Sequence, residues 1–242
     1  MEYRIECVKD NKKVCENVYK LSIKGKFEGN PGQFYMLRAW DREPLLSRPI
    51  SIYSIEKDCI EFLYAVVGEG TEILSRLKEG NSIKLTGPLG NYFPVNNLKG
   101  KIAVVSGGIG IAPMHEVVKR IKNCQVDFYC GFRDEIYGIE EYKNFVDNTY
   151  ISTESGEHGY KGYVTEIINP EKYDVVLCCG PEIMMKKVVD MCKKVNVPVY
   201  VSMEKHMACG VGACLVCTCK TKHGNKRTCK DGPVFLGEEL EE

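Results

Sequence analysis

The chain has 242 residues, and its 33 Lys and Arg residues balance 33 Asp and Glu residues, so its formal net charge at pH 7 is zero. This balance gives no support to nucleic acid or an anionic membrane surface as a general partner. The charged N-terminus lacks the apolar run of a signal peptide, and no apolar run could span a bilayer, so we expect a cytoplasmic protein.

The first 97 residues are typical of β structure. Alternating or β-branched runs are separated by Gly, Pro, Asn and Asp, and they cover residues 3–8, 18–25, 33–40, 49–55, 59–67 and 82–90. Six short strands at near-regular spacing predict an antiparallel β-barrel. One helix interrupts them over residues 70–80, where Ile73, Leu74 and Leu77 are apolar and Gly80 provides a stop.

Residues 98–203 have a different pattern, in which predicted strands alternate with predicted helices. Apolar strands are expected over 101–107, 126–132, 149–153, 173–180 and 197–202, with helices over 113–123 and 181–194. This alternation predicts a doubly wound parallel sheet. Such sheets bind ligands at the carboxyl ends of their strands.

A glycine-rich loop joins the first strand of this segment to its helix. Gly107, Gly108 and Gly110 could bring backbone amides close to a pyrophosphate at a helix N-terminus, although a tight turn alone would also use glycines. The G-x-G-x-x-G fingerprint fails, because Pro113 stands at its third glycine. Proline suits the first turn of a helix, so the loop indicates a different type of nucleotide-binding fold.

The third segment, 204–242, concentrates five of the 13 cysteines in the chain. Thiols stay reduced in the cytosol, so such a group indicates metal or redox chemistry. The spacing C-x4-C-x2-C followed by a distant cysteine is the plant-type [2Fe–2S] pattern, whereas four cysteines could also hold zinc. Cys219 is a rival to Cys217, because a strand leaving the loop would place both on one face.

Four short motifs occur in the order of a known family: RPIS (48–51), GEGT (68–71), GGIGIAP (107–113) and CCGP (178–181). Together they resemble the ferredoxin reductase family. The resemblance implies that residues 1–97 form an FAD-binding barrel and that residues 98–203 form an NAD-binding α/β domain. No basic cluster surrounds Arg133, which could contact the ribose or pair with Asp134 or Glu135, so NAD is favoured over NADP.

The same resemblance implies the cofactor-binding residues. Arg48 would contact the flavin pyrophosphate, and Pro49 would orient Ile50 and Ser51 toward the flavin ring. The remaining positions are the backbone groups of Ala65, Val66 and Val67, a second phosphate site at Gly70 and Thr71, the nucleotide loop of Gly107, Gly108 and Gly110, and Cys179 beside the nicotinamide. Thr71 is also compatible with a helix N-cap, and Cys179 with a buried strand end.

The tail MEKHMACGVGACLVCTC with RTCKDGPVF is similar to the electron-transfer subunits of NAD-linked dihydroorotate dehydrogenases. This similarity implies a domain over 204–242 that binds [2Fe–2S] through Cys209, Cys214, Cys217 and Cys229. We prefer Cys217 to Cys219 as the third ligand.

The similarity also implies a partner, an FMN-containing TIM-barrel catalytic subunit, with two copies of each chain in a heterotetramer. Electrons would pass between dihydroorotate in that partner and NAD, as a step of pyrimidine biosynthesis. No catalytic residue is assigned here, because no side chain resembles a base for dihydroorotate. A flavin/iron–sulfur subunit of a hydrogenase or transhydrogenase, and a zinc-binding interaction module without redox activity, are the alternatives.

Overall fold

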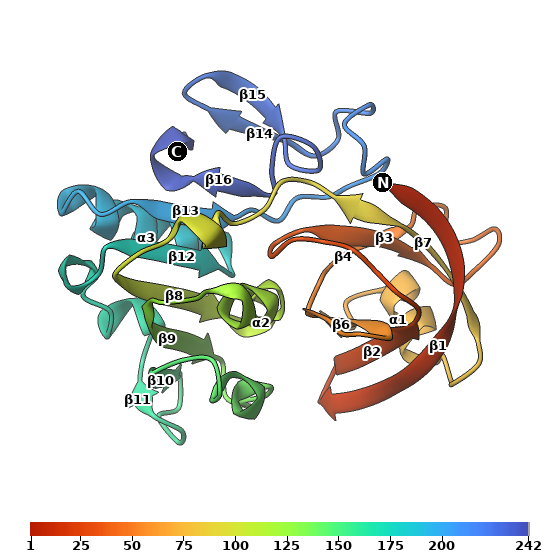
Figure 1. Ribbon diagram of the computed structural model, residues 1–242, viewed down its shortest axis with the longest axis horizontal. Coiled ribbons are helices and arrows are strands. Elements are labelled where there is room, and N and C mark those ends of the chain that lie inside the picture. The colour runs from red at the N-terminus through yellow and green to blue at the C-terminus, as the bar shows by residue number, and fades with distance from the viewer. Residues whose placement is uncertain (242) are drawn as a thin grey trace.

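A computed structural model describes residues 1–241 and contains two seven-stranded sheets, with a small hairpin above them in the view of Figure 1. The first sheet is antiparallel and has the order β4-β3-β7-β1-β2-β6-β5. Its strands are β1 (Glu2–Cys15), β2 (Val18–Lys24), β3 (Phe34–Arg38), β4 (Arg48–Ser51), β5 (Ser54–Ile55), β6 (Cys59–Ala65) and β7 (Ser82–Leu89), and helix α1 (Glu69–Ser75) follows β6. The predicted antiparallel barrel is confirmed.

The expected single strand over 49–55 is two strands, β4 and β5, at opposite edges of this sheet. Between them the Ile52 N–H donates to the Gln33 carbonyl at 3.0 Å, and the Tyr53 N–H donates to the Glu61 carbonyl at 2.9 Å. The chain therefore crosses from the β3 side to the β6 side and brings the two edges together. Ile52 is fully buried, as are Leu21, Phe62 and Leu85, which pack with it in the barrel core.

The second sheet has the order β11-β10-β9-β8-β12-β13-β16 and is parallel except at β16. Its strands are β8 (Lys101–Gly107), β9 (Gln125–Phe132), β10 (Asn148–Thr153), β11 (Tyr160–Lys161), β12 (Val175–Cys179), β13 (Val199–Ser202) and β16 (Val234–Leu236). Its two helices are α2 (Ile111–Arg120) and α3 (Glu182–Lys194). Because β9 lies on one side of β8 and β12 on the other, the strand order reverses between β8 and β12, where ligands bind in such sheets.

Successive side chains of β8 point to opposite faces of the sheet, and each face is covered by one helix. Ile102 and Val104 pack in the cluster that contains α2, whereas Ala103 and Val105 pack in the cluster that contains α3. The predicted doubly wound arrangement is confirmed. Figure 1 places α2 between the two sheets, and its cluster includes barrel residues such as Leu63.

The C-terminal tail joins both sheets. Strands β14 (Thr218–Thr221) and β15 (Gly224–Arg227) form the hairpin, and β16 adds an antiparallel edge to the second sheet. Asn91, just after β7, donates to the Asp231 carbonyl at 2.9 Å and to the Val234 carbonyl at 2.6 Å, and it accepts from the Val234 N–H at 2.8 Å. The barrel therefore holds the tail through one amide side chain.

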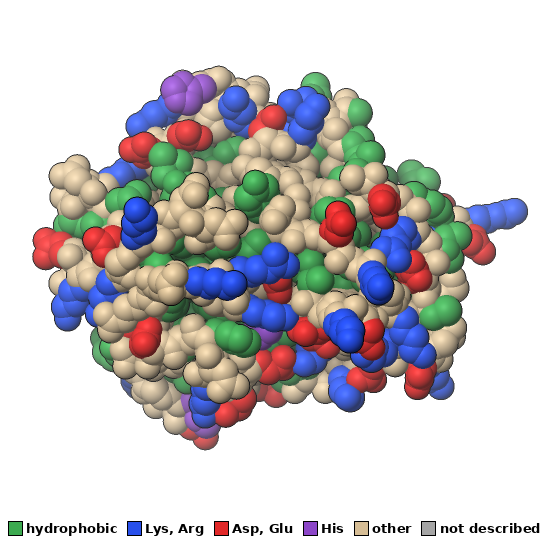
Figure 2. Space-filling model, viewed as in Figure 1, with side chains coloured by type: hydrophobic (Ala, Val, Ile, Leu, Met, Phe, Trp, Pro, Cys, Tyr) green, Lys and Arg blue, Asp and Glu red, His purple; other side chains and the backbone are tan. Residues whose placement is uncertain are grey.

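Short 3-10 turns complete the secondary structure, at Val95–Asn97, Gly108–Gly110, Ile139–Tyr142, Val164–Glu166, Pro170–Lys172 and Gly237–Glu239. None of the helices within residues 1–241 combines the length and the apolar character needed to cross a membrane. On the face drawn in Figure 2, basic and acidic side chains are interspersed, in keeping with the zero net charge of the sequence.

Candidate functional site

Arg48 and the first turn of α1 are in close contact. A Cβ atom on Gly70 would stand 2.7 Å from Arg48 Cζ, so any larger residue there would displace the guanidinium from its present position. The guanidinium also lies 5.4 Å from the centre of the Trp40 ring and donates to the Leu46 carbonyl. Its remaining N–H groups are suited to phosphate, because one guanidinium can donate two parallel hydrogen bonds to two phosphate oxygens. The fold thus brings the RPIS and GEGT motifs together.

The hydroxyl of Thr71 forms hydrogen bonds with backbone groups of the same chain. This group donates to the Gly68 carbonyl at 2.7 Å and accepts from the N–H groups of Val67 at 2.9 Å and Gly68 at 3.1 Å. The side chain is 5% exposed. The hydroxyl of Thr71 therefore caps the start of α1, and its contact with a phosphate stays a prediction.

The segment 65–67 runs from the end of β6 toward α1. Ala65 ends the strand, the Val66 N–H donates to the Asn17 carbonyl at 2.7 Å, and the Val67 N–H is bound by Thr71. The Val67 side chain is 85% exposed. The N–H groups of Val66 and Val67 are therefore used within the chain, and the apolar side chain of Val67 is exposed at this edge.

Residues of β4 alternate between two faces. Ile50 pairs with Tyr35 and packs against the barrel core, whereas Ser51 pairs with Phe34. Pro49 shares the face of Ser51, because side chains two positions apart in a strand point the same way. Ile50 and Ser51 therefore point in opposite directions, which corrects the expectation that both face one ring. The Ser51 face is the one on which the C-terminal tail packs, through Phe34.

The glycine loop packs against the loop that follows β12. A Cβ on Gly110 would stand 2.6 Å from the Cys179 carbonyl carbon, and one on Gly107 would stand 2.7 Å from Met184 Sδ. Gly108 differs, because it has a left-handed φ of +52° and a Cβ atom added there would meet no other atom within 4 Å. Packing at the switch point thus favours glycine at 107 and 110, whereas Gly108 borders open space.

Replacing Gly110 with alanine is expected to force the two loops apart. Because the new methyl group would meet backbone atoms, we expect a loss of about 1–3 kcal/mol in unfolding free energy, together with weaker NADH binding. Gly108→Ala should cost about 1–2 kcal/mol from its left-handed backbone but create no clash. Urea unfolding and NADH titration check both variants, and an unchanged unfolding free energy in Gly110→Ala would contradict the packing role given to Gly110.

Cys179 is 1% exposed and lies in the core beside α2. Burial raises the pKa of its thiol well above the ordinary value, so the group is neutral at physiological pH. Cys179 is thus a buried strand end, and its contact with a nicotinamide stays a prediction. Arg133 is exposed at the end of β9, and within residues 1–241 it forms no ion pair with Asp134 or Glu135.

The first two cysteines of the tail form one pair. Cys209 Sγ accepts backbone N–H groups from Val211 at 3.4 Å, Ala213 at 3.3 Å and Cys214 at 3.4 Å. Partial burial acts to raise the pKa of Cys209, but the hydrogen bonds from Cys214, Val211 and Ala213 outweigh it and lower the pKa to about 6. The loop therefore stabilises a thiolate, the form that binds metals.

Cys217 and Cys229 form a second pair. The Cys229 N–H donates to Cys217 Sγ at 3.4 Å, and both side chains are 2% exposed against an apolar seat made by Phe34, Met36 and Leu89. Burial, the hydrogen bond with Cys217 and the charge of Cys209 raise the pKa of Cys229 to about 12. Gly212, in the loop between Cys209 and Cys214, packs against Lys230, the neighbour of Cys229, so the two pairs are close together.

Cys219 belongs to a different part of the structure. It packs with residues of α3 and β13, such as Met185 and Val201, in the second core of the α/β sheet. Strand β14 begins at Thr218, so Cys217 lies outside it and strand alternation does not relate the two thiols. The expectation that Cys217 and Cys219 share a face is therefore wrong, while the preference for Cys217 is supported by its contact with Cys229.

The loop over residues 209–217 is also held by contacts that no sequence motif predicts. Gly210 has φ +71°, and a Cβ there would stand 2.8 Å from Met36 Cγ on β3. Arg227 pairs with Asp231 through two hydrogen bonds of 2.9 and 3.0 Å, and this pair lowers the pKa of Asp231 to about 2. No motif marks these residues, because each contact joins positions that are ordinary in isolation.

The donor set fits two irons better than one metal ion. Within residues 1–241, no three His, Cys, Asp or Glu side chains converge on a point that could hold a single ion. The thiols instead form the adjacent pairs Cys209 with Cys214 and Cys217 with Cys229. A [2Fe–2S] cluster takes two protein ligands on each iron, which is the arrangement that such pairs supply.

A barrel, a parallel sheet with an open glycine loop at its switch point, and a paired-thiol tail define a ferredoxin-reductase-type electron-transfer protein. The family model described as the iron–sulfur cluster binding domain of dihydroorotate dehydrogenase B matches residues 204–241. The chain belongs to the family of electron transfer subunits of dihydroorotate dehydrogenase B (NAD(+)). The relative from Clostridium acetobutylicum is 62% identical over 239 residues, covering 99% of this chain and 97% of the relative.

Other relatives agree with this assignment. The subunit of the same name from Clostridium perfringens is 54% identical and covers 100% of this chain and 99% of its own length. Among solved structures, an NADH-dependent reduced ferredoxin-NADP oxidoreductase superposes with a TM-score of 0.88 at 29% identity, over 98% of this chain and 90% of that one. A ferredoxin NADP+ reductase from Neisseria gonorrhoeae, at 17% identity and TM-score 0.65 over 86% of this chain and 96% of its own, shares the fold.

Proposed function

We propose that this chain carries electrons between NAD(H) and an FMN-containing dihydroorotate dehydrogenase catalytic subunit, using FAD and a [2Fe–2S] cluster, in pyrimidine biosynthesis. Flavin, when bound, exchanges two electrons with a nicotinamide and single electrons with a cluster. The observation that carries the proposal is the seat of Cys217 and Cys229 on Phe34 of β3. Phe34 pairs with Ser51 of β4, so the thiols pack against the strand that lies next to the RPIS motif.

The barrel residues would bind and orient FAD. Arg48 would bind the pyrophosphate through the N–H groups that do not donate to the Leu46 carbonyl. Gly70 would leave room for the guanidinium of Arg48. Pro49 and Ser51 would face the side of the strand toward the tail, whereas Ile50 would support the site from the core. Ala65, Val66 and Val67 would line the edge of this site, and the amides of Gly70 and Thr71 in the first turn of α1 would meet the second phosphate.

The α/β residues would bind NAD(H) at the switch point. Gly108 would approach the nucleotide through its backbone, with Gly107 and Gly110 keeping the loop against Cys179. No cluster of basic side chains surrounds the exposed Arg133, which favours NAD over NADP. The site proposed for the nucleotide lies in the domain over 98–203, next to the barrel domain over 1–97.

The tail domain over 204–242 would bind the cluster through Cys209, Cys214, Cys217 and Cys229. The N–H groups around Cys209 would stabilise negative charge on its sulfur, and the apolar seat of Cys217 and Cys229 would exclude water. The partner would be the catalytic subunit that the name of the family implies, with two copies of each chain. No residue here is assigned to dihydroorotate.

We expect the isolated chain, with its cofactors, to oxidise NADH with an artificial electron acceptor and to show no turnover of dihydroorotate. The proposed flavin and nucleotide sites are in this chain, whereas the dihydroorotate site is not. Steady-state assays with each substrate check the prediction, first alone and then after addition of the catalytic subunit. Turnover of dihydroorotate by this chain alone would contradict the two-subunit proposal.

The same preparation tests the alternatives. A colourless sample with zinc and no flavin would favour the zinc-binding module. A coloured sample that reduces NAD with a hydrogenase partner but not with the catalytic subunit would favour the hydrogenase or transhydrogenase alternative. The 62% identity to a dihydroorotate dehydrogenase B subunit supports the main proposal over both.

A further inference from the structure

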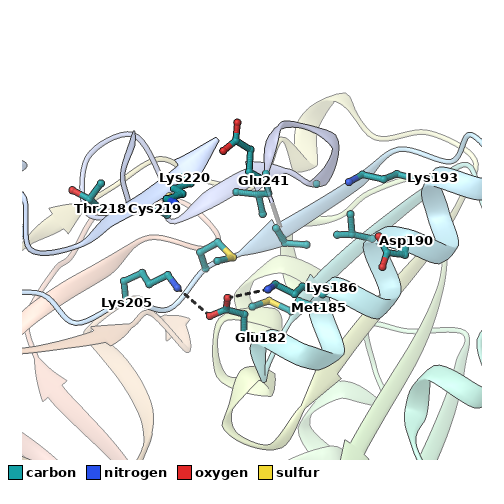
Figure 3. Close-up of a pocket in the computed structure, with 15 residues that line it drawn as sticks. Glu182, Met185, Lys186, Asp190, Lys193, Lys205, Thr218, Cys219, Lys220 and Glu241 are labelled. Atoms are coloured by element: carbon teal, nitrogen blue, oxygen red, sulfur yellow. Dashed lines mark hydrogen bonds and ion pairs between the residues drawn. The ribbon is translucent and has the colours of Figure 1, made fainter. Parts of the chain in front are cut away.

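A pocket of about 560 Å³ lies between α3, β13 and the C-terminal tail, outside the sites described above. Its volume falls within the range of pockets that hold small organic molecules. Figure 3 shows its lining, with side chains of α3 on one side and those of β14 and the chain end on the other. None of the residues proposed for flavin, nucleotide or cluster lines it.

The floor of this pocket is apolar. Met185 and Val189 lie one turn apart on α3, Val201 belongs to β13, and Met203 and Leu240 complete the surface. The thiol of Cys219 also lines the pocket, on the side of β14. Such a floor can cover the apolar body of a ligand and remove it from water.

Lysines are more numerous than carboxylates around the rim. The lining includes Lys186, Lys193, Lys205 and Lys220, and the carboxylates are Glu182, Asp190 and Glu241. Glu182 lies 3.0 Å from Lys205 Nζ and 3.7 Å from Lys186 Nζ, as the dashed lines in Figure 3 show. One carboxylate is thus shared by two ammonium groups, and within residues 1–241 Lys193 and Lys220 form no ion pair.

We propose that this pocket binds an amphipathic organic anion, with an apolar or aromatic body and one acidic group. The body would lie on the apolar floor, and the acidic group would meet Lys193 and Lys220, the two rim lysines that form no ion pair within residues 1–241. The charge of the rim and the apolar floor are both needed, since either alone would accept a different class of ligand.

The pocket touches elements that extend from two of the proposed cofactor sites. Met184 of α3 packs on Gly107 of the nucleotide loop, and β14 begins directly after Cys217. An anion in the pocket would contact both α3 and β14. Its lysines are separate from the residues proposed for electron transfer, so either proposal can fail without the other.

The test uses the complex of this chain with its catalytic subunit, all cofactors bound. The probe is 4-(trifluoromethyl)benzoate, followed by 19F NMR, and the neutral 4-(trifluoromethyl)benzamide is its control. We expect saturable binding of the benzoate and at least about tenfold weaker binding of the amide, because only the benzoate carries an acidic group.

Matched variants locate the binding. Lys193→Glu with Lys220→Glu reverses two rim charges and should weaken benzoate binding by about tenfold or more. Lys194→Glu with Lys222→Glu makes the same change in net charge at neighbouring positions that do not line the pocket, and should leave binding within about twofold. Leu240→Ser, which removes apolar floor, should weaken binding of the benzoate severalfold. NADH oxidation should be unchanged in the two double variants.

Several outcomes would overturn the proposal. These are absence of benzoate binding to the complex, equal binding of benzoate and benzamide, and equal effects of the rim and control variants. Binding to the isolated chain but not to the complex would show that the partner covers the pocket, and would also overturn it as a ligand site.

Discussion

Cys217→Ser is expected to deplete or visibly alter the cluster, whereas Cys219→Ser leaves its absorption and electron paramagnetic resonance spectra almost unchanged. Cys217 shares a hydrogen bond and an apolar seat with Cys229, and Cys219 packs on the other side of the tail against α3. Loss of one thiolate leaves an iron without its full ligand set. Flavin content should be normal in both variants, because the flavin residues lie in the barrel.

For Cys219→Ser the expected effect is on the stability of the fold and not on the cluster. A hydroxyl at buried position 219 would lie among apolar side chains, so Cys219→Ser should lower the unfolding free energy by about 1–3 kcal/mol without loss of iron. Cys219→Ala serves as the control for polarity. Iron and sulfide analysis with spectroscopy checks the assignment. Depletion by Cys219→Ser and not by Cys217→Ser would reassign the ligand to Cys219.

Arg48→Ala is expected to weaken FAD binding by roughly 10- to 100-fold, since charge-assisted hydrogen bonds contribute about 1.5–3 kcal/mol. Iron content should stay near normal, because Arg48 does not touch the tail cysteines. Arg48→Lys should recover only part of the affinity, because an ammonium group lacks the paired donors of a guanidinium. Flavin release and chromatography also identify the bound flavin, and recovery of FMN would contradict the pyrophosphate contact.

Gly70→Ala tests the same contact with Arg48 still present. The added methyl group would stand 2.7 Å from Arg48 Cζ, so the guanidinium must move and flavin affinity should fall. Gly68→Ala is the matched control on the same turn, because its Cβ meets no atom within 4 Å and its φ of 170° is extended backbone. Joint loss of flavin and iron in Arg48→Ala would show instead that Arg48 supports the fold.

Local sequence patterns were sufficient to predict the class of protein. Alternation in runs such as 82–90, the helical spacing of 181–194 and the glycines at 107–110 predicted the barrel, the doubly wound sheet and the loop at its switch point. These features are readable because the side-chain period of a strand or helix is set by the backbone itself. The cysteine spacing with Cys229 was equally local, and it pointed to a cluster of two irons.

Contacts between distant segments were decided only by the tertiary structure. The sequence could not show that Cys219 faces α3 while Cys217 faces Cys229, because the side of a short strand depends on where that strand starts. It also could not show that Gly70 makes room for Arg48 or that Asn91 holds the tail at Val234. By itself the sequence determined the type of element that dominates each domain, the order of the domains and the chemistry of the thiols. Packing decided which side chains meet, because a close contact depends on the placement of both segments and leaves no periodic trace in either one.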